Sequence, residues 1–281
     1  MPILSLADVI ILASAKGIRL IVKTARKLND LYLRILVIIN CIPNTKYQIA
    51  LVSPSTWLGQ CASQSTVFKN CTITTIPNTI DTNTYTPINV NTARQLLNLP
   101  EKTKILLFGA ASATSDPRKG YDLLKSALTQ LSQNINISNI MLVVFGASHG
   151  NEDCNSPFQI RYMGKLHDEL TLRLLYSAAD VFICPSREDN LPNTIIEASA
   201  CATASVGFDT CGIPDLIEHG VTGALAKPFD TKSLASAIEN ALIHSTEYGK
   251  NARKKAEQTY NETKISKHYL KLYRKRLEIK K

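Results

Sequence analysis

Closely spaced cysteine pairs are absent from this 281-residue sequence. Its seven cysteines are odd in number and widely scattered, and no two of them form a Cys-x-x-Cys pair. Zinc sites and redox-active dithiols commonly use such pairs, so the sequence disfavours both kinds of site. We therefore expect a reduced, cytoplasmic compartment.

Apolar runs of membrane-spanning length are also missing. The apolar runs near the start, residues 9–15 and 35–39, lie among charged residues. A spanning helix needs about 20 consecutive, mostly apolar residues, so we predict no transmembrane helix. The first basic residue, Lys16, follows the apolar run of residues 9–15, so we expect no secretory signal. No Gly-x-Gly-x-x-Gly motif follows a predicted strand, which argues against a dinucleotide dehydrogenase.

The formal charge of +9 concentrates late in the chain, in residues 250–255 and 264–281. A nucleic-acid partner would call for a recognised reading motif with exposed aromatic residues, and none is present, so we expect no such partner. Peripheral contact with the anionic inner face of the plasma membrane would need a basic stripe beside an apolar one, and this alternative stays open. We favour a solvated helix face, because four residues have a helical spacing suited to packing on the protein itself: Ile265, Tyr269, Leu272 and Tyr273.

From Lys104 onward, short apolar runs alternate with longer segments of helical periodicity. The predicted strands are residues 104–108, 140–145, 181–184 and 204–206, and the predicted helices are residues 121–131, 168–178, 194–201 and 233–244. We also predict a polar loop at residues 151–157 and a turn at residues 211–214. This alternation predicts an α/β fold with a doubly wound parallel sheet. Such sheets bind ligands at the carboxyl ends of their strands, so we expect the site in the loops after Phe108, Phe145 and Cys184.

The first hundred residues show a weaker pattern. We predict a strand at residues 47–52, a helix at 55–65, a strand at 73–76 and a linker at 83–91. The apolar segments before Tyr47 have no order that the pattern assigns.

The segment Pro185–Glu197 follows a predicted strand and opens a predicted helix. Free backbone amides and the helix macrodipole at such a helix start favour a phosphate group. Asp189 and Glu197 are separated by seven residues, and their carboxylates could accept hydrogen bonds from the vicinal hydroxyls of ribose and of a hexose. Taken alone, this segment is better explained as an acidic capping loop before a helix.

A second polar loop, Asp116-Pro117-Arg118-Lys119-Gly120, also joins a predicted strand to a predicted helix. Arg118 and Lys119 could bind a diphosphate, since an arginine is bidentate and a lysine acts as a point charge. A surface turn with two solvated cations explains this short motif equally well. The presence of both loops in equivalent positions is what favours a phosphorylated ligand.

Six motifs in a fixed order make the sequence similar to glycosyltransferase family 4, particularly its bacterial exopolysaccharide and O-antigen members of the colanic-acid type. The motifs are Ser53-Pro-Ser-Thr-Trp57-Leu58, Ile76-Pro-Asn78-Thr-Ile-Asp81, Asp116-Pro-Arg-Lys-Gly120, Leu175-Tyr-Ser-Ala-Ala-Asp180 with Pro185-Ser186, Asp189-Asn-Leu-Pro-Asn-Thr194 with Glu197-Ala198, and Gly212-Ile-Pro-Asp215 with Gly220-Val-Thr-Gly223. The resemblance covers residues 47–281. Each motif alone is weak, and their order and spacing carry the similarity.

The resemblance implies a GT-B fold and retaining transfer of a sugar from a UDP- or GDP-linked donor to a glycan or lipid-linked acceptor. No metal or other cofactor is required in that family, and the pathway would be cell-surface polysaccharide biosynthesis. By the same resemblance, Asp189 contacts the transferred sugar and Glu197 holds the donor ribose. Arg118 and Lys119 neutralise the diphosphate, aided by the backbone amides near Asn193 and Thr194. Asn190 and Leu191, in the same motif, are expected to contribute to donor binding.

The resemblance also implies a division into three parts. Residues 1–90 would be a partial, acceptor-side Rossmann-like domain, residues 91–262 the donor-binding Rossmann-like domain, and residues 263–281 a basic terminal helix that packs back on the first domain. A complete domain of this kind needs about 150 residues, so we expect most of the acceptor domain to be missing.

Two other hypotheses stay open. One is a non-catalytic module that binds a nucleotide sugar or a partner chain. The other is a sugar-nucleotide epimerase of the same fold, which would need a catalytic carboxylate and histidine in its first domain. No histidine precedes His149, which disfavours the epimerase.

Overall fold

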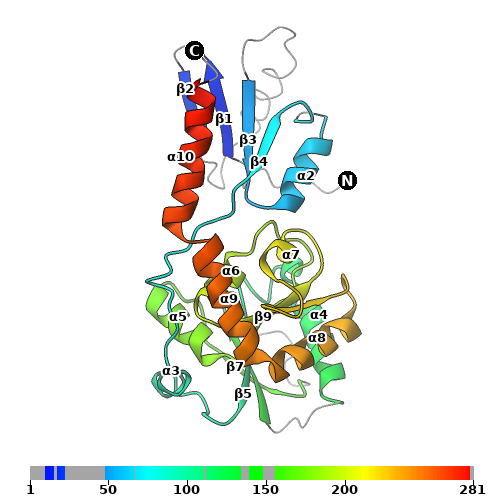
Figure 1. The fold of residues 1–281 in the computed structure, drawn as a ribbon. Helices are drawn as coiled ribbons and strands as arrows, with labels where there is room; N and C mark the ends of the chain where they lie inside the picture. Colours follow the sequence, from blue (N-terminus) through cyan, green and yellow to red (C-terminus); the bar gives the residue numbers. More distant parts are fainter. Residues whose placement is uncertain are drawn as a thin grey trace. The chain divides into compact units, whose positions relative to one another are not determined.

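The computed structural model describes residues 10–15, 18–22, 48–66, 68–110, 112–133, 139–147 and 156–278 (Figure 1). The chain divides into two compact units, residues 1–77 and residues 78–281. The roles expected for the parts of the chain, acceptor side and donor side, stay predictions.

Among its described residues, the first unit contains a four-stranded mixed sheet and one helix. Its elements are β1 (Ile10–Ala15), β2 (Ile18–Val22), β3 (Gln48–Ser53), α2 (Thr56–Gln64) and β4 (Thr72–Thr75). The strand order is β2-β1-β3-β4, with β1 antiparallel to both neighbours and β3 parallel to β4. The strands expected near residues 47–52 and 73–76 and the helix between them are confirmed. Ser55 caps this helix by accepting a hydrogen bond from the amide of Leu58 at 3.1 Å.

The second unit is built on a six-stranded sheet in which every strand pair is parallel. Its strands are β5 (Lys104–Gly109), β6 (Ile140–Phe145), β7 (Gln159–Tyr162), β8 (Val181–Cys184), β9 (Ala204–Phe208) and β10 (Gly223–Ala226), in the order β10-β9-β8-β5-β6-β7. The predicted doubly wound parallel sheet is therefore confirmed. The central strands are apolar throughout because both of their faces are covered by helices.

Helices cover both faces of this sheet. They are α3 (Val90–Leu96), α4 (Tyr121–Leu131), α5 (Glu169–Ala178), α6 (Asn193–Ala200), α7 (Ile213–Leu216), α8 (Thr231–Ile243), α9 (Ser245–Thr259) and α10 (Glu262–Glu278). Side chains of α4 and α8 pack with one set of strand residues, including Leu106 and Val144. Side chains of α3, α5 and α6 pack with the alternate set, including Leu107 and Phe145. Successive side chains of a strand point to opposite faces of the sheet, so alternate residues enter the two apolar layers.

Several details differ from the sequence-based expectations. Strands β7 and β10 and helix α3 were not expected, and the predicted turn at residues 211–214 runs into the short helix α7. Residues 83–91, expected as a linker, belong to the second unit and contact its helices. Tyr85 is buried, its carbonyl accepts a hydrogen bond from Arg253 at 2.6 Å, and the amide of Ile88 donates to the Ser177 hydroxyl at 3.1 Å. Of the polar loop expected at residues 151–157, residues 151–155 lie outside the described residues.

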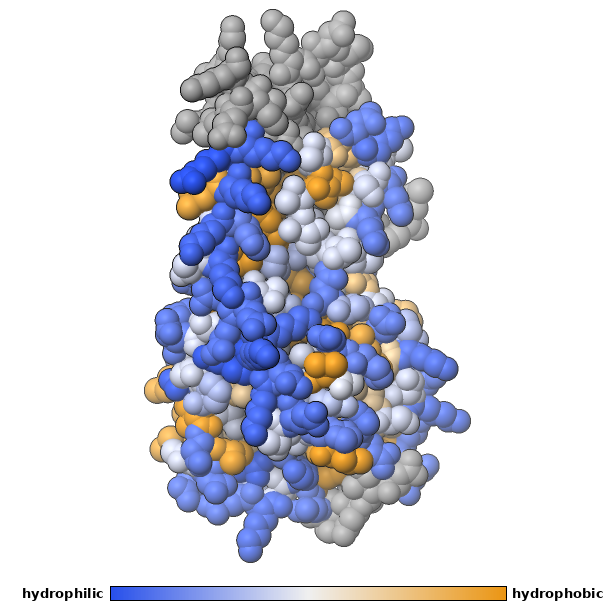
Figure 2. Space-filling model, in the orientation of Figure 1, coloured by the Kyte–Doolittle hydropathy of each residue, from blue (hydrophilic) through white to orange (hydrophobic). Residues whose placement is uncertain are grey.

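The charged end of the chain forms α9 and α10. Figure 2 shows hydrophilic side chains gathered over both helices. Ile265 of α10 is buried and Tyr269 and Leu272 are partly buried, as their spacing predicted, whereas Tyr273 is exposed. Among the described residues, no helix is both long enough and apolar enough to span a membrane.

Candidate functional site

Two strand-to-helix loops meet at the carboxyl edge of the second sheet, because β5 and β8 are direct neighbours. The loop after β5 packs so closely on the end of β8 that a Cβ atom on Gly120 would lie 1.9 Å from the carbonyl oxygen of Pro185. Gly120 also has a φ of +69°, a left-handed conformation that glycine adopts without strain. The amide of Arg187 donates to the carbonyl of Arg118 at 2.8 Å. Two of the three loops in which the sequence analysis expected the site, those after Phe108 and Cys184, are therefore in contact.

The meeting point carries an ion pair between the predicted site residues Lys119 and Asp189. The Lys119 ammonium lies 2.7 Å from the Asp189 carboxylate, and the two side chains are 25% and 15% exposed. Lys119 ends the short 3₁₀ helix Pro117–Lys119, and Asp189 lies in the loop between β8 and α6. The amide of Gly212 donates to the Asp189 carbonyl at 3.1 Å, so the loop after β9 also supports this position.

Arg118, the second predicted cation, is more exposed. Its guanidinium makes an ion pair with Asp116 at 2.8 Å, and the Asp116 carboxylate also accepts from the Arg118 amide at 3.0 Å. These hydrogen bonds hold the pKa of Asp116 below its usual value. Arg187 binds Asp122 at 2.6 Å, which fixes the start of α4 against the loop after β8 and lowers the pKa of Asp122.

Helix α6 begins without a side-chain cap. Its N-cap residue is Pro192, whose side chain makes no cap hydrogen bond to the amides of the first turn. The interpretation of the preceding acidic loop as a capping loop is therefore wrong, because Asp189 pairs with Lys119 instead. The side-chain amide of Asn193 accepts a hydrogen bond from Asn78 at 2.8 Å.

The other predicted donor-binding residues of this loop differ in exposure. Asn190 and Thr194 are partly exposed, whereas the Leu191 side chain is buried in the apolar layer with α3 and α5. Burial leaves only the main chain of Leu191 as a group that could contact a ligand.

Glu197, the last predicted residue, is on α6 and is partly buried. The hydroxyl of Tyr176 on α5 donates a hydrogen bond to its carboxylate at 2.7 Å. Burial raises the pKa of Glu197 above its usual value, the hydrogen bond from Tyr176 lowers it, and the charge of Glu169 raises it. A carboxylate of this kind has remaining acceptor capacity for ligand hydroxyls.

The structure thus brings Lys119 and Asp189 together from separate loops and pairs Glu197 with Tyr176. Sequence reasoning missed four supporting residues: Asn78, Tyr176, Arg187 and Gly212. Three of them lie inside the motifs quoted above, and Arg187 lies between two, so the motifs were the available signal. Among the described residues, no group of three or more His, Cys, Asp or Glu side chains could hold a metal ion.

Comparison with known proteins extends this picture. The family described as "Glycosyl transferases group 1" matches residues 102–244, just over half of the chain, and this stretch contains every predicted site residue. The chain belongs to the group 1 glycosyltransferases.

Other group 1 glycosyltransferases and solved structures resemble the chain over different lengths. Alpha-maltose-1-phosphate synthase of Mycobacterium tuberculosis is 37% identical over 124 residues, which is 39% of this chain and 32% of the relative. A Campylobacter jejuni N,N'-diacetylbacillosaminyl-diphospho-undecaprenol alpha-1,3-N-acetylgalactosaminyltransferase is 28% identical over 185 residues, 63% of this chain and 46% of the relative. HepE of Anabaena, solved in complex with UDP-glucose, matches 88% of this chain and 68% of its own with a TM-score of 0.69 and 19% identity. The chain thus spans less than half of these two curated relatives, and the solved structure supports the GT-B type fold.

Proposed function

We propose that this chain acts as a retaining glycosyltransferase of family 4, of the hexosyltransferase type, that transfers a sugar from a nucleotide-sugar donor to a glycan or lipid-linked acceptor. The observation that supports this most directly is the meeting of a lysine and a carboxylate, Lys119 and Asp189, at the carboxyl edge of the parallel sheet. Ligands of doubly wound sheets bind at this edge. The solved neighbour HepE holds UDP-glucose on the same fold, which favours a nucleotide sugar as the ligand.

The loop between β5 and α4 is proposed to contribute positive charge. When the bond between the sugar and the diphosphate breaks, negative charge grows on the leaving diphosphate. Lys119, Arg118 and the backbone amides of Asn193 and Thr194, at the start of α6, would stabilise that charge electrostatically. Because these groups already supply cations and donors, we propose that donor binding needs no metal, and we expect it to persist in EDTA.

Carboxylates provide the proposed sugar contacts. Glu197 would accept hydrogen bonds from the donor ribose, and Asp189 from the transferred sugar, with Asn190 and the Leu191 main chain completing the loop around the donor. In this scheme Lys119 leaves Asp189 when the diphosphate binds. The Asp189 carboxylate then pairs with Lys119 in the ligand-free state and accepts hydrogen bonds from the sugar in the bound state.

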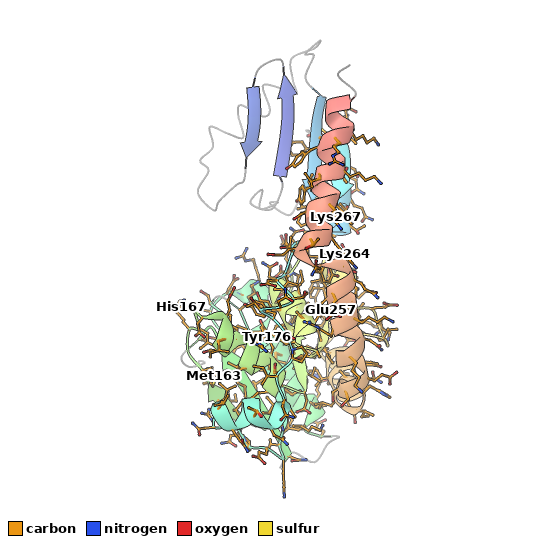
Figure 3. The ribbon with its side chains drawn as sticks, turned by 60° about the vertical axis from the view of Figure 1, so that its left-hand side comes forward. Met163, His167, Tyr176, Glu257, Lys264 and Lys267 are labelled. Atoms are coloured by element: carbon orange, nitrogen blue, oxygen red, sulfur yellow. The ribbon has the colours of Figure 1, made fainter. Side chains whose placement is uncertain are left out.

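The acceptor is proposed to be lipid-linked, in cell-surface polysaccharide biosynthesis at the inner face of the plasma membrane. The name of the Campylobacter relative describes transfer to a diphospho-undecaprenol-linked substrate, which supports this class. In this chain, α10 exposes Leu270 (52%) and Tyr273 (36%) beside basic residues that include Lys264 and Lys267 (Figure 3). This combination favours peripheral contact with anionic lipid. Co-sedimentation with vesicles containing anionic lipid, abolished by added salt, is the expected result.

Calorimetry and thermal shift against UDP, GDP and ADP sugars test the proposed donor site. We expect one nucleotide class to raise the melting temperature, and Lys119→Ala and Glu197→Ala each to abolish that ligand-induced shift. Two matched controls are Lys102→Ala, exposed before the opposite end of β5, and Glu239→Ala, partly buried on α8. A shift that survives both site substitutions would place the ligand elsewhere and contradict the proposal.

Transfer itself needs a separate measurement. Release of the nucleoside diphosphate with sugar transfer to a lipid-linked acceptor, followed by NMR of the new linkage, would report both activity and retention of configuration. Binding without transfer or hydrolysis would favour the alternative of a non-catalytic nucleotide-sugar-binding or partner-binding module.

A further inference from the structure

We propose that Tyr176 is a positioning residue that holds the Glu197 carboxylate in place to accept hydrogen bonds from the ribose of a nucleotide-sugar donor. This inference rests on the proposed function and assigns a task to a residue outside the ligand-contacting set. Tyr176 lies inside the second unit (Figure 3) and has no exposed surface, so it acts through Glu197 and not on the ligand.

The surroundings of Tyr176 fix its ring. Phe145 and Phe182 contact it edge-to-face, with ring centroids 5.9 Å and 5.7 Å away. The backbone carbonyl of Tyr176 accepts a hydrogen bond from the Thr203 hydroxyl at 2.7 Å. This bond connects the end of α5 to the loop between α6 and β9. Close packing between two strands and a helix fixes the position of the ring, and therefore the position of its hydroxyl group.

That hydroxyl points at the carboxylate. It donates to Glu197 Oε2 at 2.7 Å, the usual length for a strong O–H···O bond to a charged acceptor. A carboxylate can accept about four hydrogen bonds, so one from Tyr176 leaves capacity for a pair of vicinal hydroxyls. The bond also restricts rotation of the glutamate side chain, which otherwise would have to be ordered when the ligand binds.

The other groups around Glu197 make this hydrogen bond important for its charge. Burial and the charge of Glu169 both raise the pKa of Glu197, and only the bond from Tyr176 lowers it. Tyr85 and Cys201 also face Glu197. Burial raises the pKa of Tyr85, and it raises the pKa of Cys201 to about 12, so both stay neutral near pH 7. Tyr176 is therefore the neighbour that favours the ionised, acceptor-only form of the carboxylate.

The test compares UDP with 2′,3′-dideoxy-UDP, which lacks both ribose hydroxyls, or the guanosine pair if the chain prefers GDP. Calorimetry on the whole chain should show that Tyr176→Phe weakens UDP binding about tenfold and leaves dideoxy-UDP binding unchanged, since a hydrogen bond to a charged group is worth about 1.5 kcal/mol or more. The acid-side midpoint of UDP binding should move to higher pH in the variant, because the lost hydrogen bond favoured the ionised form. Titration of the ligand phosphate is common to both proteins and cancels in this comparison.

Tyr248→Phe is the matched control. Tyr248 is also buried, and its hydroxyl donates to a helix side chain, Asn240, at 3.0 Å, but it lies in the apolar layer on the other face of the sheet. It should cost a similar amount of stability and leave the binding of both nucleotides unchanged. Should Tyr176→Phe not fold, 3-fluorotyrosine at position 176 keeps the ring, and its more acidic hydroxyl should shift the acid-side midpoint to lower pH.

The outcomes separate the two proposals. Absence of nucleotide binding by the unsubstituted chain overturns the proposed function, and this inference with it. Preference for UDP over dideoxy-UDP, combined with equal weakening of both nucleotides or no weakening in Tyr176→Phe, overturns the positioning role alone. A midpoint that does not move has the same consequence.

Discussion

At the scale of single residues, the Lys119–Asp189 pair links the ligand-free structure to the chemistry proposed for it. A diphosphate and the Asp189 carboxylate compete for the same ammonium group. Both side chains are partly buried, so their attraction is screened less than that of a fully exposed pair. The pair keeps Lys119 oriented toward the site. It also neutralises part of the positive charge that would bind the diphosphate.

This competition predicts an unequal response in Asp189→Asn. Affinity for UDP should rise roughly fivefold, because release of an ion pair worth about 1 kcal/mol leaves Lys119 free for the diphosphate. Affinity for the UDP sugar should rise less, and sugar transfer should fall, because the carboxylate that accepts from the sugar is gone. Titration calorimetry with both ligands is the measurement. Glu188→Gln, a charge loss at an exposed neighbouring residue, is the control and should change UDP affinity less. A fall in UDP affinity for Asp189→Asn would contradict the competition.

The burial of Glu197 predicts that removing its charge stabilises the folded protein and weakens nucleotide binding. Because burial raises the pKa of Glu197 in the folded protein above the ordinary value of 4.5, ionising it disfavours the folded state. The cost is absent below pH 4.5, where the carboxyl is protonated in both states, and develops as the pH rises through the folded-state pKa. Glu197→Gln should therefore melt at a higher temperature than the unsubstituted chain at pH 7 and at a similar temperature near pH 4, while losing nucleotide affinity. Melting curves across this range check the sign, and a gain that is equal at both pH values would show that the carboxylate charge is not its cause.

At the scale of elements, the approach of two loops depends on one glycine. Gly120 and Gly164 have nearly the same φ, +69° and +70°, but a Cβ on Gly120 would meet the Pro185 carbonyl at 1.9 Å, whereas a Cβ on Gly164 would meet nothing within 4 Å. Gly164→Ala should cost about 1–2 kcal/mol of unfolding free energy, the price of the left-handed conformation alone. Gly120→Ala should cost clearly more, and should also weaken nucleotide binding, because Lys119 is displaced from Asp189. Chemical denaturation of the two variants measures their unfolding free energies. An equal loss of unfolding free energy in both variants would contradict the prediction.

In the second unit, the strands that the sequence predicted are those whose residues are mostly buried on both faces. Residues 140–145 and 181–184 coincide with β6 and β8, and the helix at 121–131 coincides with α4, because burial on two faces or on one helical stripe leaves a clear pattern. Strand β7 has the sequence Gln-Ile-Arg-Tyr at the sheet edge, and β10 has Gly-Ala-Leu-Ala, which lacks β-branched residues. Their conformation comes from pairing with a formed neighbour, and a single sequence does not contain that information.

The site was predictable in its residue types and only partly in its geometry. The sequence placed the two loops at the carboxyl edge of a parallel sheet, whereas the structure shows that β5 and β8 are neighbours and that Lys119 pairs with Asp189. The hydrogen bond from Tyr176 to Glu197 joins two residues that are 21 positions apart in sequence, and only the packing of α5 against α6 brings them together. The interpretation of the loop as an acidic cap was wrong for a related reason: a capping pattern is local in sequence, whereas Asp189 pairs with Lys119 of a distant loop.

At the scale of the whole molecule, the apolar layers belong to separate units. The two layers of the six-stranded sheet draw their side chains from residues 80–260, whereas the small cluster of the first unit uses Leu51, Leu58 and Ala62 with the residues packed on them. All the proposed donor-binding residues lie in the second unit. In the proposed scheme, nucleotide recognition and folding of that unit therefore depend on one core.

This separation predicts that residues 78–281 alone fold and bind the donor nucleotide. A unit with its own two-sided core should unfold cooperatively, and its affinity for UDP, or for whichever nucleoside diphosphate the full chain prefers, should equal that of the full chain. Sugar transfer should be lost, because the acceptor is expected to need residues outside this unit. Calorimetry of both proteins side by side is the measurement, and Lys119→Ala in the shorter protein is the control that identifies the site. A shorter protein that folds but no longer binds the nucleotide would show that the first unit contributes ligand contacts, and the donor site would then extend beyond the sheet edge described here.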